Sequence, residues 1–588
     1  MKLHFNHNKR VSQLGVLLLG AFIVLIYGSC AKDYENIPLG QQATLDLTFD
    51  THDSSGINAL RFLNEVYNNA LLNGHNRLGG DYIDAASDDA VSSIAGLSSV
   101  EKIQSGAYTP TNLIPDDIWT KSYATIRSAT VFIIYIDRVP LLEALPDRRP
   151  ARSAYKAEAR FLRAWTYFEL IRRYGGVPIL EDKAYQLTDN IELPRSSFED
   201  CVKYITSELD KAADSLRPQE MINSTSYGRI TKGAAMALKA KVLLYAASPL
   251  FNGGNIDPSN PLTGYTSFDK QRWKLAADAA SKVRDLGTYG LDSDFESVFT
   301  TQEAPIGSNT ENIFWRQNGN NSNVEKANAP IGYTTAGGNG RTSPTQNLVD
   351  AFPMKNGLSI TDALSGYNES DPYVNRDPRL KSTVFYNGQR WLNRDVELYD
   401  GGIDRPGGTV QQTKTGYYLR KFMGSFENVP GGLYGNTIHD WIFIRYGGIL
   451  LDYAEATNEF EGPTNEVYQV LYDLRKRAGI EAGDDGHYGI KSGMDQVAMR
   501  TAIRSERRIE MAFEEQRYWD IRRWKIAKDV YASPLMGMDI QMIGSGQLFY
   551  NRVDIFSPVF TDPKMYLYPI PYDEVVKNEQ MQQNPGWK

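Results

Sequence analysis

Three glutamates near the C-terminal end of the chain have a spacing that could support acid–base chemistry. Glu506, Glu510 and Glu514 recur at i, i+4 and i+8, which predicts that they lie on one face of a single helix. Paired carboxylates hydrolyse glycosidic bonds, but they usually converge from different elements across a cleft. Arginines are interleaved with these glutamates, at positions 507, 508, 517, 522 and 523. We therefore expect structural ion pairs here and no catalytic residue.

Cys30 follows a segment with the layout of a bacterial export signal. Basic residues open the chain, an apolar run spans residues 14–27, and two small residues precede the thiol. The run is shorter than the roughly 20 residues of a membrane-spanning helix. The junction resembles a lipobox, in which the cysteine is acylated, although Tyr27 stands where an aliphatic residue is usual. We expect residues 1–29 to be a lipoprotein signal peptide and Cys30 to carry a lipid; an ordinary secretory signal is the alternative.

Other residues that could act as nucleophiles or metal ligands lack the necessary spacing. Cys201 recurs with apolar residues at helical intervals, which predicts a small core side chain. The six histidines are scattered, and the sequence contains neither HExxH nor CxxC. The acidic runs at 81–90 and 367–377 do not have the spacing of an EF-hand. We expect no metal and no cofactor.

Composition narrows the class of ligand. The formal net charge is −8, and removal of a signal segment with three basic and no acidic residues leaves about −11. That charge argues against nucleic acid as a partner. Tyrosine is abundant, with 35 residues against 23 phenylalanines. A phenol combines an apolar face with a polar group, which suits partly hydrated ligands such as sugars or peptides.

Two loop segments outside the helical patterns, residues 79–93 and 315–341, combine aromatic rings with amides and carboxylates. A carbohydrate site needs an aromatic face for the sugar ring and a few polar groups for its hydroxyls. Trp315 follows a strand-like stretch, so core packing is an equally reasonable role for that ring. The ligand-binding residues that we predict are Tyr82, Asp88, Asp89, Tyr108, Trp315, Asn320, Asn321, Tyr333 and Trp391.

Long helical patterns must position these segments. Residues 154–174 carry an apolar stripe that ends at Gly175 and Gly176, and similar patterns succeed one another towards residue 287. Successive helices predict a mostly α-helical fold of TPR-like hairpins forming an α-α superhelix. A loop-rich insertion with short strands interrupts them. We expect one domain over 30–588, with its boundaries as follows: a helical scaffold at about 57–287 and 438–530, the loop-rich ligand subdomain at about 288–437, and an extended C-terminal segment at 531–588.

Ten sequence blocks in a fixed order resemble the SusD/RagB-like outer-membrane lipoproteins of Gram-negative bacteria. The first departs from the family pattern at Thr130, where asparagine is usual. The blocks are WTKSYATIRSAT, AEARFLRAWTYFELIRRYGGVPIL, LPRSSFEDCVKYITSELDKA, GRITKGAAMALKAKVLLYAASPL, SPTQNLVDAFPMKNG, NRDPRL, RYGGILLDYAEATNE, ERRIEMAFEEQRYWDIRRW, YPIP and QNPGW.

This resemblance implies a lipid-anchored protein on the outer surface of the outer membrane. It would bind oligosaccharide or polysaccharide fragments and deliver them to a SusC-like TonB-dependent transporter, its partner, without covalent chemistry. A RagB-like protein that binds peptide is one alternative. A glycan-degrading enzyme is another, and a lid that only docks to the transporter is a third.

Overall fold

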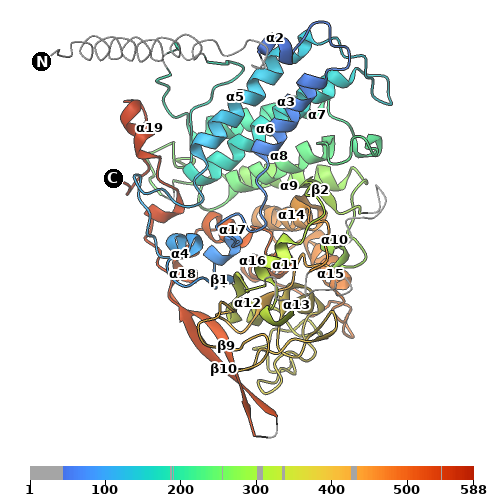
Figure 1. The fold of residues 1–588 in the computed structure, drawn as a ribbon, viewed down its shortest axis with the longest axis vertical. Helices are drawn as coiled ribbons and strands as arrows, with labels where there is room; N and C mark the ends of the chain where they lie inside the picture. The colour runs from blue at the N-terminus through green and yellow to red at the C-terminus, as the bar shows by residue number, and fades with distance from the viewer. Residues whose placement is uncertain are drawn as a thin grey trace, which may run out of the picture.

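The computed structural model of the chain is mostly helical, as the sequence predicts (Figure 1). It describes residues 44–185, 188–189, 191–254, 256–300, 309–333, 338–425, 434–544 and 546–588. Cys30 and the expected signal peptide lie outside these residues. In the described part, no helix is both long enough and apolar enough to cross a membrane.

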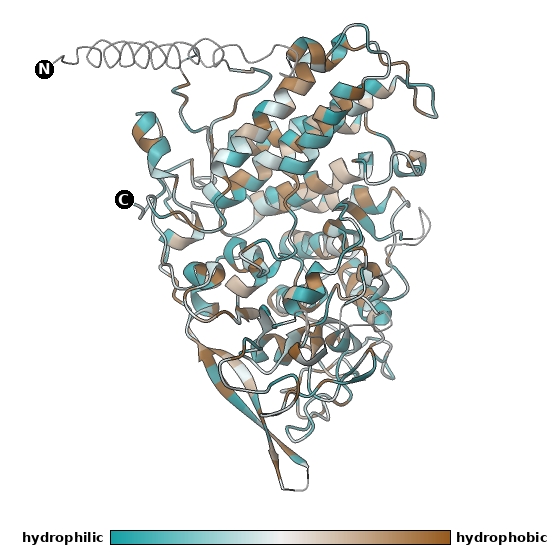
Figure 2. Cartoon of the chain, viewed as in Figure 1, coloured by the Kyte–Doolittle hydropathy of each residue, from teal (hydrophilic) through white to brown (hydrophobic). Residues whose placement is uncertain are grey.

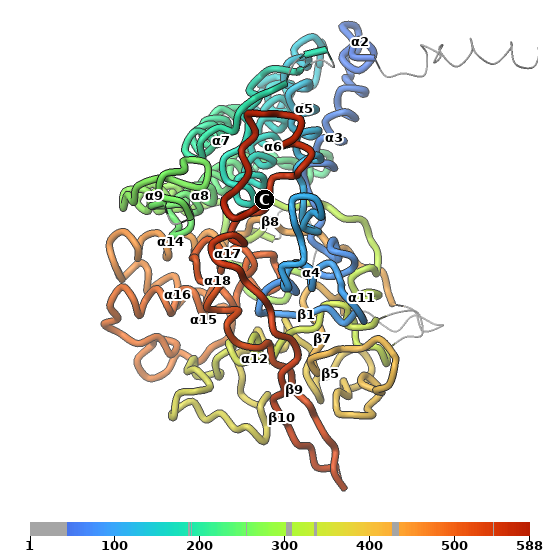
Figure 3. Tube along the Cα trace, turned by 90° about the vertical axis from the view of Figure 1, so that its left-hand side faces the viewer, coloured from blue at the N-terminus to red at the C-terminus, as the bar shows by residue number. Residues whose placement is uncertain are grey.

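The scaffold consists of helices in which each packs on the next along the chain. Helix α5 packs on α6, α6 on α7, α7 on α8 and α8 on α9, and Figure 3 shows them as one slanting tier. This stacking confirms the TPR-like arrangement. The bounds are α2 Leu45–Thr48, α3 Ile57–Ala70, α5 Trp119–Tyr135, α6 Ala151–Tyr174, α7 Phe198–Ala213, α8 Lys232–Ala247 and α9 Gln271–Arg284. Those beyond the insertion are α14 Tyr446–Glu461, α15 Asn465–Ala478, α16 Gln496–Glu510 and α17 Arg517–Arg523.

Helix α6 ends where the sequence predicts, and the apolar stripes of the scaffold helices face inward. Helix α6 ends at Gly175, whose φ of +76° suits glycine and whose Cβ, if present, would lie 2.3 Å from the Leu262 carbonyl oxygen. Cys201 is buried on the inner face of α7, which confirms its predicted core position. Hydrophobic and hydrophilic residues alternate along these helices in Figure 2, as expected for helices with one buried face.

The insertion leaves the scaffold and returns to it at one place. Helix α9 packs directly on α14, and strand β2 (Asn312–Arg316) pairs antiparallel with β8 (Trp441–Arg445) at the two ends of the insertion. The sequence predicts that the helical scaffold resumes at about residue 438. That prediction is wrong for β8, because its backbone pairs with β2, and the helix begins only at Tyr446.

Within the insertion, regular structure is short. Two predicted strand pieces are confirmed, since β4 (Val384–Phe385) pairs with β7 (Tyr418–Leu419). Two further pairs join β1 to β3 and β5 to β6, with bounds Ala90–Ser92, Thr342–Pro344, Arg390–Trp391 and Arg394–Asp395. The small helices here and elsewhere are α4 Ser99–Gln104, α10 Ser297–Thr300, α11 Asn323–Asn328, α12 Gln346–Ala351, α13 Pro378–Thr383, α18 Ala527–Val530 and α19 Tyr572–Lys577. Single 3₁₀ turns are η1 Ile83–Ala86, η2 Ile136–Arg138, η3 Gln219–Met221, η4 Ile331–Tyr333 and η5 Lys564–Tyr566.

The C-terminal segment contains a hairpin that the sequence did not predict. Strands β9 (Leu535–Ile543) and β10 (Gln547–Phe556) pair antiparallel, and the hairpin protrudes at the lower end of the molecule in Figures 1 and 3. After the hairpin, the chain returns along the scaffold to helix α19, which lies beside α5 and α6 in Figure 1.

Candidate functional site

The glutamate series that could have supported catalysis is not arranged on one helix. Helix α16 ends at Glu510, and the turn that follows contains two residues with left-handed backbone, Phe513 (φ +60°) and Glu515 (φ +55°). Glu514 therefore lies outside the helix, and the prediction of a single helix through all three glutamates is wrong. Glu510 and Glu514 nevertheless meet at one cation from the insertion boundary, whereas Glu506 pairs with other arginines.

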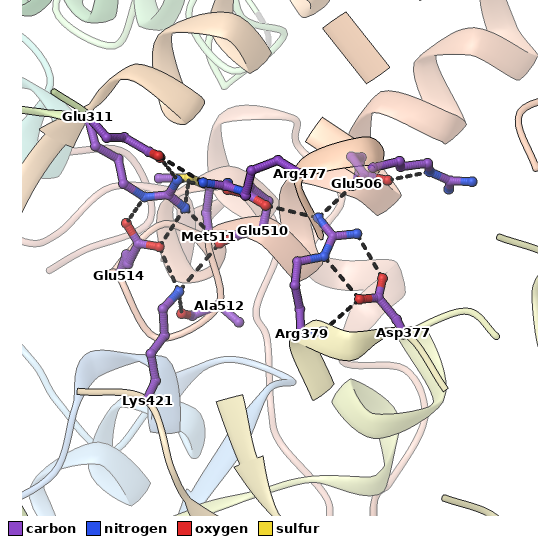
Figure 4. A network of polar contacts seen from close by, with 12 residues as sticks. Glu311, Asp377, Arg379, Lys421, Arg477, Glu506, Glu510, Met511, Ala512 and Glu514 are labelled. Carbon is purple, nitrogen blue, oxygen red and sulfur yellow. Dashed lines mark hydrogen bonds and ion pairs between the residues drawn. The ribbon is translucent and has the colours of Figure 1, made fainter. Parts of the chain in front are cut away.

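Arg445, at the end of β8, contacts three glutamates that Figure 4 labels, Glu311, Glu510 and Glu514. Its Nη1 lies 2.6 Å from Glu311 Oε1 and 2.8 Å from Glu510 Oε1, and its Nε lies 2.8 Å from Glu514 Oε2. Lys421 Nζ also contacts Glu514, at 2.7 Å. All of these side chains are buried. The network joins β8, α16 and the turn after α16.

The predicted ion pairing is confirmed, but most partners differ from the predicted ones. Glu506 and Glu510 both pair with Arg379 of α13, and Glu506 also pairs with Arg475 of α15. The interleaved arginines point elsewhere: for example, Arg507 pairs with Asp452 and Asp520. Sequence spacing could not show this, because the cations that reach the glutamates come from distant segments.

These charges keep the glutamates ionised. Burial raises the pKa of Glu510, but the positive charges of Arg477, Arg445 and Arg379 outweigh it and hold that pKa well below its ordinary value. A carboxyl group held ionised cannot donate the proton that glycoside hydrolysis requires. The cluster therefore has the chemistry of a structural network.

Four of the predicted ligand-binding residues come from the N-terminal part of the chain and are buried. Asp88 and Asp89 each lie 2.8 Å from Arg508 Nη2, and Asp88 also pairs with Arg517. The other two are aromatic. The Tyr82 hydroxyl lies 2.6 Å from His75 Nδ1, and the Tyr108 ring packs 5.2 Å from the Trp587 ring. Each of the four makes internal contacts.

The remaining predicted residues lie in the insertion. Tyr333 and Trp391 are brought together, with ring centroids 4.7 Å apart, and the Arg394 guanidinium lies 3.9 Å from the Tyr333 ring. Trp391 is buried and Tyr333 half-buried. Asn320 is exposed, while Asn321 donates to the Gly319 carbonyl at 2.6 Å. Ligand contact by these residues stays a prediction.

Of the nine predicted residues, Trp315 lines a hollow with the chemistry of a sugar site. We call this hollow, of about 360 Å³, the α3–β2 groove. It lies between the C-terminal half of α3, the loop before α8 and the end of β2. Its lining residues are Asn64, Tyr67, Asn68, Leu71, Thr225, Tyr227, Gly228, Arg229, Trp315, Arg316 and Gln317.

Arg316 fixes β2 against the end of α3. Its Nη1 donates to the carbonyl oxygens of Asn68, at 3.3 Å, and of Leu71, and its Nη2 donates to Asn68 Oδ1 at 2.8 Å. The last carbonyls of a helix lack partners within the helix, and a cation there also complements the helix dipole. The guanidinium therefore positions one wall of the groove against the other.

The aromatic wall is formed by two rings from different segments. The Tyr227 and Trp315 centroids are 5.5 Å apart with the rings tilted by 53°. Gln317 Nε2 donates to the Tyr227 carbonyl at 3.2 Å. Gly228 has a φ of +77°, and its Cβ, if present, would lie 2.7 Å from Gln317 Cδ. The positive φ favours glycine, and the hydrogen bond from Gln317 holds the loop against β2.

Tyr67 closes the bottom of the groove and joins it to the scaffold. Its hydroxyl donates to Glu158 Oε2 at 2.9 Å and accepts from the Ile230 amide at 3.1 Å. Burial, followed by the nearby charge of Glu158, raises the pKa of Tyr67 well above its ordinary value, so the phenol is neutral. It can act as a polar, uncharged surface.

The groove offers the groups that bind a sugar. Tyr227 supplies a half-buried ring, and Asn64, Asn68 and Gln317 are exposed amides. Among the described residues, those lining it include no Asp or Glu. The sequence missed most of these residues because they come from three distant segments. Asn64 and Asn68 in particular have the spacing of an ordinary solvated helix face.

Two family models match the chain in succession. Residues 44–244 match a family described as starch-binding, associating with the outer membrane. Residues 295–587 match the SusD family, also named SusD_RagB.

Individual proteins agree with these matches. A SusD-like protein P2 of Formosa agariphila is 23% identical over 479 residues, which cover 80% of each chain. A SusD-like protein of Bacteroides ovatus is 32% identical over 385 residues, covering 64% of this chain and 59% of that one. The crystal structure of a SusD-like protein from Bacteroides fragilis covers 93% of this chain and all of its own, with a TM-score of 0.75 and 27% identity. The chain belongs to the SusD/RagB family.

Proposed function

We propose that this protein binds oligosaccharide or polysaccharide fragments in the α3–β2 groove. The descriptions of proteins with the same fold favour a carbohydrate as the ligand. One solved structure, from Bacteroides fragilis, is described as a SusD-like carbohydrate-binding protein, and another as a laminarin-binding SusD-like protein. One of the matching families is itself described as starch-binding.

One observation carries the proposal. A half-buried tyrosine ring, three exposed amides and two arginines meet in one open hollow. Aromatic rings bind the apolar faces of sugars, and amides and guanidinium groups donate to hydroxyls. The lining residues lack carboxylates, so the groove has no acid–base pair for hydrolysis, and it binds without turnover.

The wider role follows from the family and from the export signal. The protein is held at the outer membrane by a lipid on Cys30, faces the cell exterior, and passes its ligand to a SusC-like TonB-dependent transporter. Capture at a site held close to the transporter raises the local ligand concentration without requiring high affinity.

Calorimetric titration of residues 31–588 tests the ligand class. The panel contains plant, host and microbial polysaccharides together with mixed peptides. We expect saturable binding to a glycan, with the glycan recovered unchanged. Saturation by peptides alone would instead assign a RagB-like role, and recovery of shortened glycans would assign a hydrolase.

Two variants test the place of binding. Tyr227→Ala removes the ring and Asn68→Ala removes an amide, and each is expected to weaken binding at least about tenfold. Tyr572→Ala is the matched control, because Tyr572 is 49% exposed and lies on α19, away from the groove. Unchanged affinity in both groove variants would place the ligand elsewhere.

A further inference from the structure

We infer that the α3–β2 groove selects acidic oligosaccharides, whose sugars carry carboxylate or sulfate groups. This inference rests on the proposed function and names the class of ligand for the same site. It comes from the balance of charge around the groove, which is opposite in sign to that of the chain as a whole.

The groove is lined by two cations, and its described lining residues include no anion. The cations are Arg229 and Arg316. The complete chain has a formal charge of −8. A positive hollow on a negative protein concentrates anionic ligands at one place while the remaining surface repels them.

Arg316 is a cation without a counter-ion. Its hydrogen bonds go to backbone carbonyls and to the neutral amide of Asn68, and within the described ranges no carboxylate lies at ion-pair distance. Burial lowers the pKa of Arg316, and no nearby carboxylate opposes that shift. An anionic group of a ligand could supply the missing charge partner.

Lys121 adds a second uncompensated charge. It is exposed on α5, and desolvation followed by the charge of Arg316 lowers its pKa. Helix α5 packs on α3, and Arg316 contacts the last carbonyls of α3, so the two cations lie on neighbouring elements and repel each other. In the part of the chain that the structure describes, Lys121 has no ion-pair partner. A ligand anion near both cations would relieve this repulsion.

Behind the groove lie two arginines and two carboxylates. Glu158 accepts from two arginines, Arg217 and Arg229, the latter at 3.0 Å, so this carboxylate cannot neutralise both. Burial, and then the charge of the acidic residue Asp440, raises the pKa of Tyr227. Asp440 is itself buried, and burial raises its pKa to about 6.

Titration with three probes of equal length tests the inference: an oligogalacturonide, a sulfated oligogalactan and a neutral oligogalactan. We expect at least one acidic probe to bind about tenfold more tightly than the neutral one. Its affinity should fall as salt rises from about 20 to about 200 mM, because mobile ions screen the charges. Preference for one of the two acidic probes distinguishes a carboxylate from a sulfate site.

Variants locate the charge effect. Lys121→Gln should weaken the acidic probe about threefold to tenfold and leave the neutral probe unchanged. Arg316→Gln should remove most of the preference, and Arg316→Lys should restore part of it. Lys274→Gln is the control, since Lys274 pairs with Asp278 on α9, outside the groove. Because Arg316 also caps α3, its variants are checked for an unchanged Tm. Lys121→Gln tests the inference without disturbing the contact between Arg316 and α3.

The outcomes separate the inference from the proposed function. Equal affinity for acidic and neutral probes, or an acidic preference that Lys121→Gln and Arg316→Gln leave intact, would overturn the charge selection while glycan binding stands. If none of the three probes binds and peptides do bind, both the charge selection and the proposed glycan binding would be overturned.

Discussion

At Arg445, three glutamates converge on one buried guanidinium, and Glu510 is the most heavily shared of them. Its carboxylate contacts Arg445, Arg379 and Arg477. A buried cation that loses its partner costs more than the pair contributed, because the remaining charge is left in a dry interior. The network therefore stabilises the junction of scaffold and insertion only while every partner is present.

Glu510→Gln is expected to lower the free energy of unfolding by about 3 to 5 kcal/mol, because three arginines lose an ionised partner. Denaturant unfolding followed by far-UV circular dichroism measures the change. Glu461→Gln, at the exposed end of α14, is the control and should change stability little. Glycan affinity should be unaffected. A loss of hydrolytic activity in Glu510→Gln would instead assign the cluster a catalytic role.

Asp81 should make part of the stability depend on pH. Burial raises the pKa of Asp81 to about 7, against the weaker effects of the Ser92 hydroxyl and of Arg341, 3.8 Å away. The folded state thus holds a proton that the unfolded state releases near pH 4. Its stabilising contribution is complete below that pH and is lost as the pH rises through about 7.

Asp81→Asn removes this titration. Relative to the wild type, the variant should gain roughly 2 to 3 kcal/mol in unfolding free energy between pH 5 and pH 8. Urea titrations at both pH values measure the gain, and taking the difference between the proteins cancels other titrating groups. A difference that does not change with pH would show that Asp81 is already ionised at pH 5.

At the scale of elements, sequence patterns predict some helix ends correctly and miss others. The end of α6 could be predicted, because two adjacent glycines follow the helix and end it. The end of α16 could not, because the helical pattern continues through Phe513 and the break is imposed by the packing of the turn against Arg445. Similarly, β8 has an apolar pattern that fits a helix, and only its pairing with β2 makes it a strand.

Gly175→Ala tests the stop of α6. The added methyl group would meet the Leu262 carbonyl oxygen at 2.3 Å, in a left-handed backbone that already disfavours alanine. Gly287→Ala is a matched control, with a φ of +64° and open space around the new Cβ. We expect Gly287→Ala to cost about 1 kcal/mol and Gly175→Ala at least about 1 kcal/mol more. Equal losses in thermal unfolding would show that the contact with Leu262 relaxes freely.

At the scale of the whole molecule, the scaffold could be predicted and the groove could not. Each scaffold helix carries its own apolar stripe, so its existence is encoded locally. The groove forms where α3, the loop before α8 and β2 meet, and these segments are brought together only by the complete fold. Predicted ligand residues such as Asp88 and Tyr82 have suitable chemistry but are used by the core. Trp315 is a predicted residue that does line the groove, and its contact with a ligand stays a prediction.

The proposed lipid anchor depends on one thiol, that of Cys30. Cys30 follows the signal-like run, whereas Cys201, the other cysteine, is buried in α7. In cells given labelled palmitate, we expect the wild type to incorporate label and to sediment with the outer membrane. Cys30→Ala should lose the label and remain soluble, because no other segment is expected to hold the mature chain to a membrane. Cys201→Ala is the control and should keep the label, since its thiol is enclosed by the core. Label retained in Cys30→Ala would refute the anchor and leave an ordinary secretory signal as the explanation of the N-terminal segment.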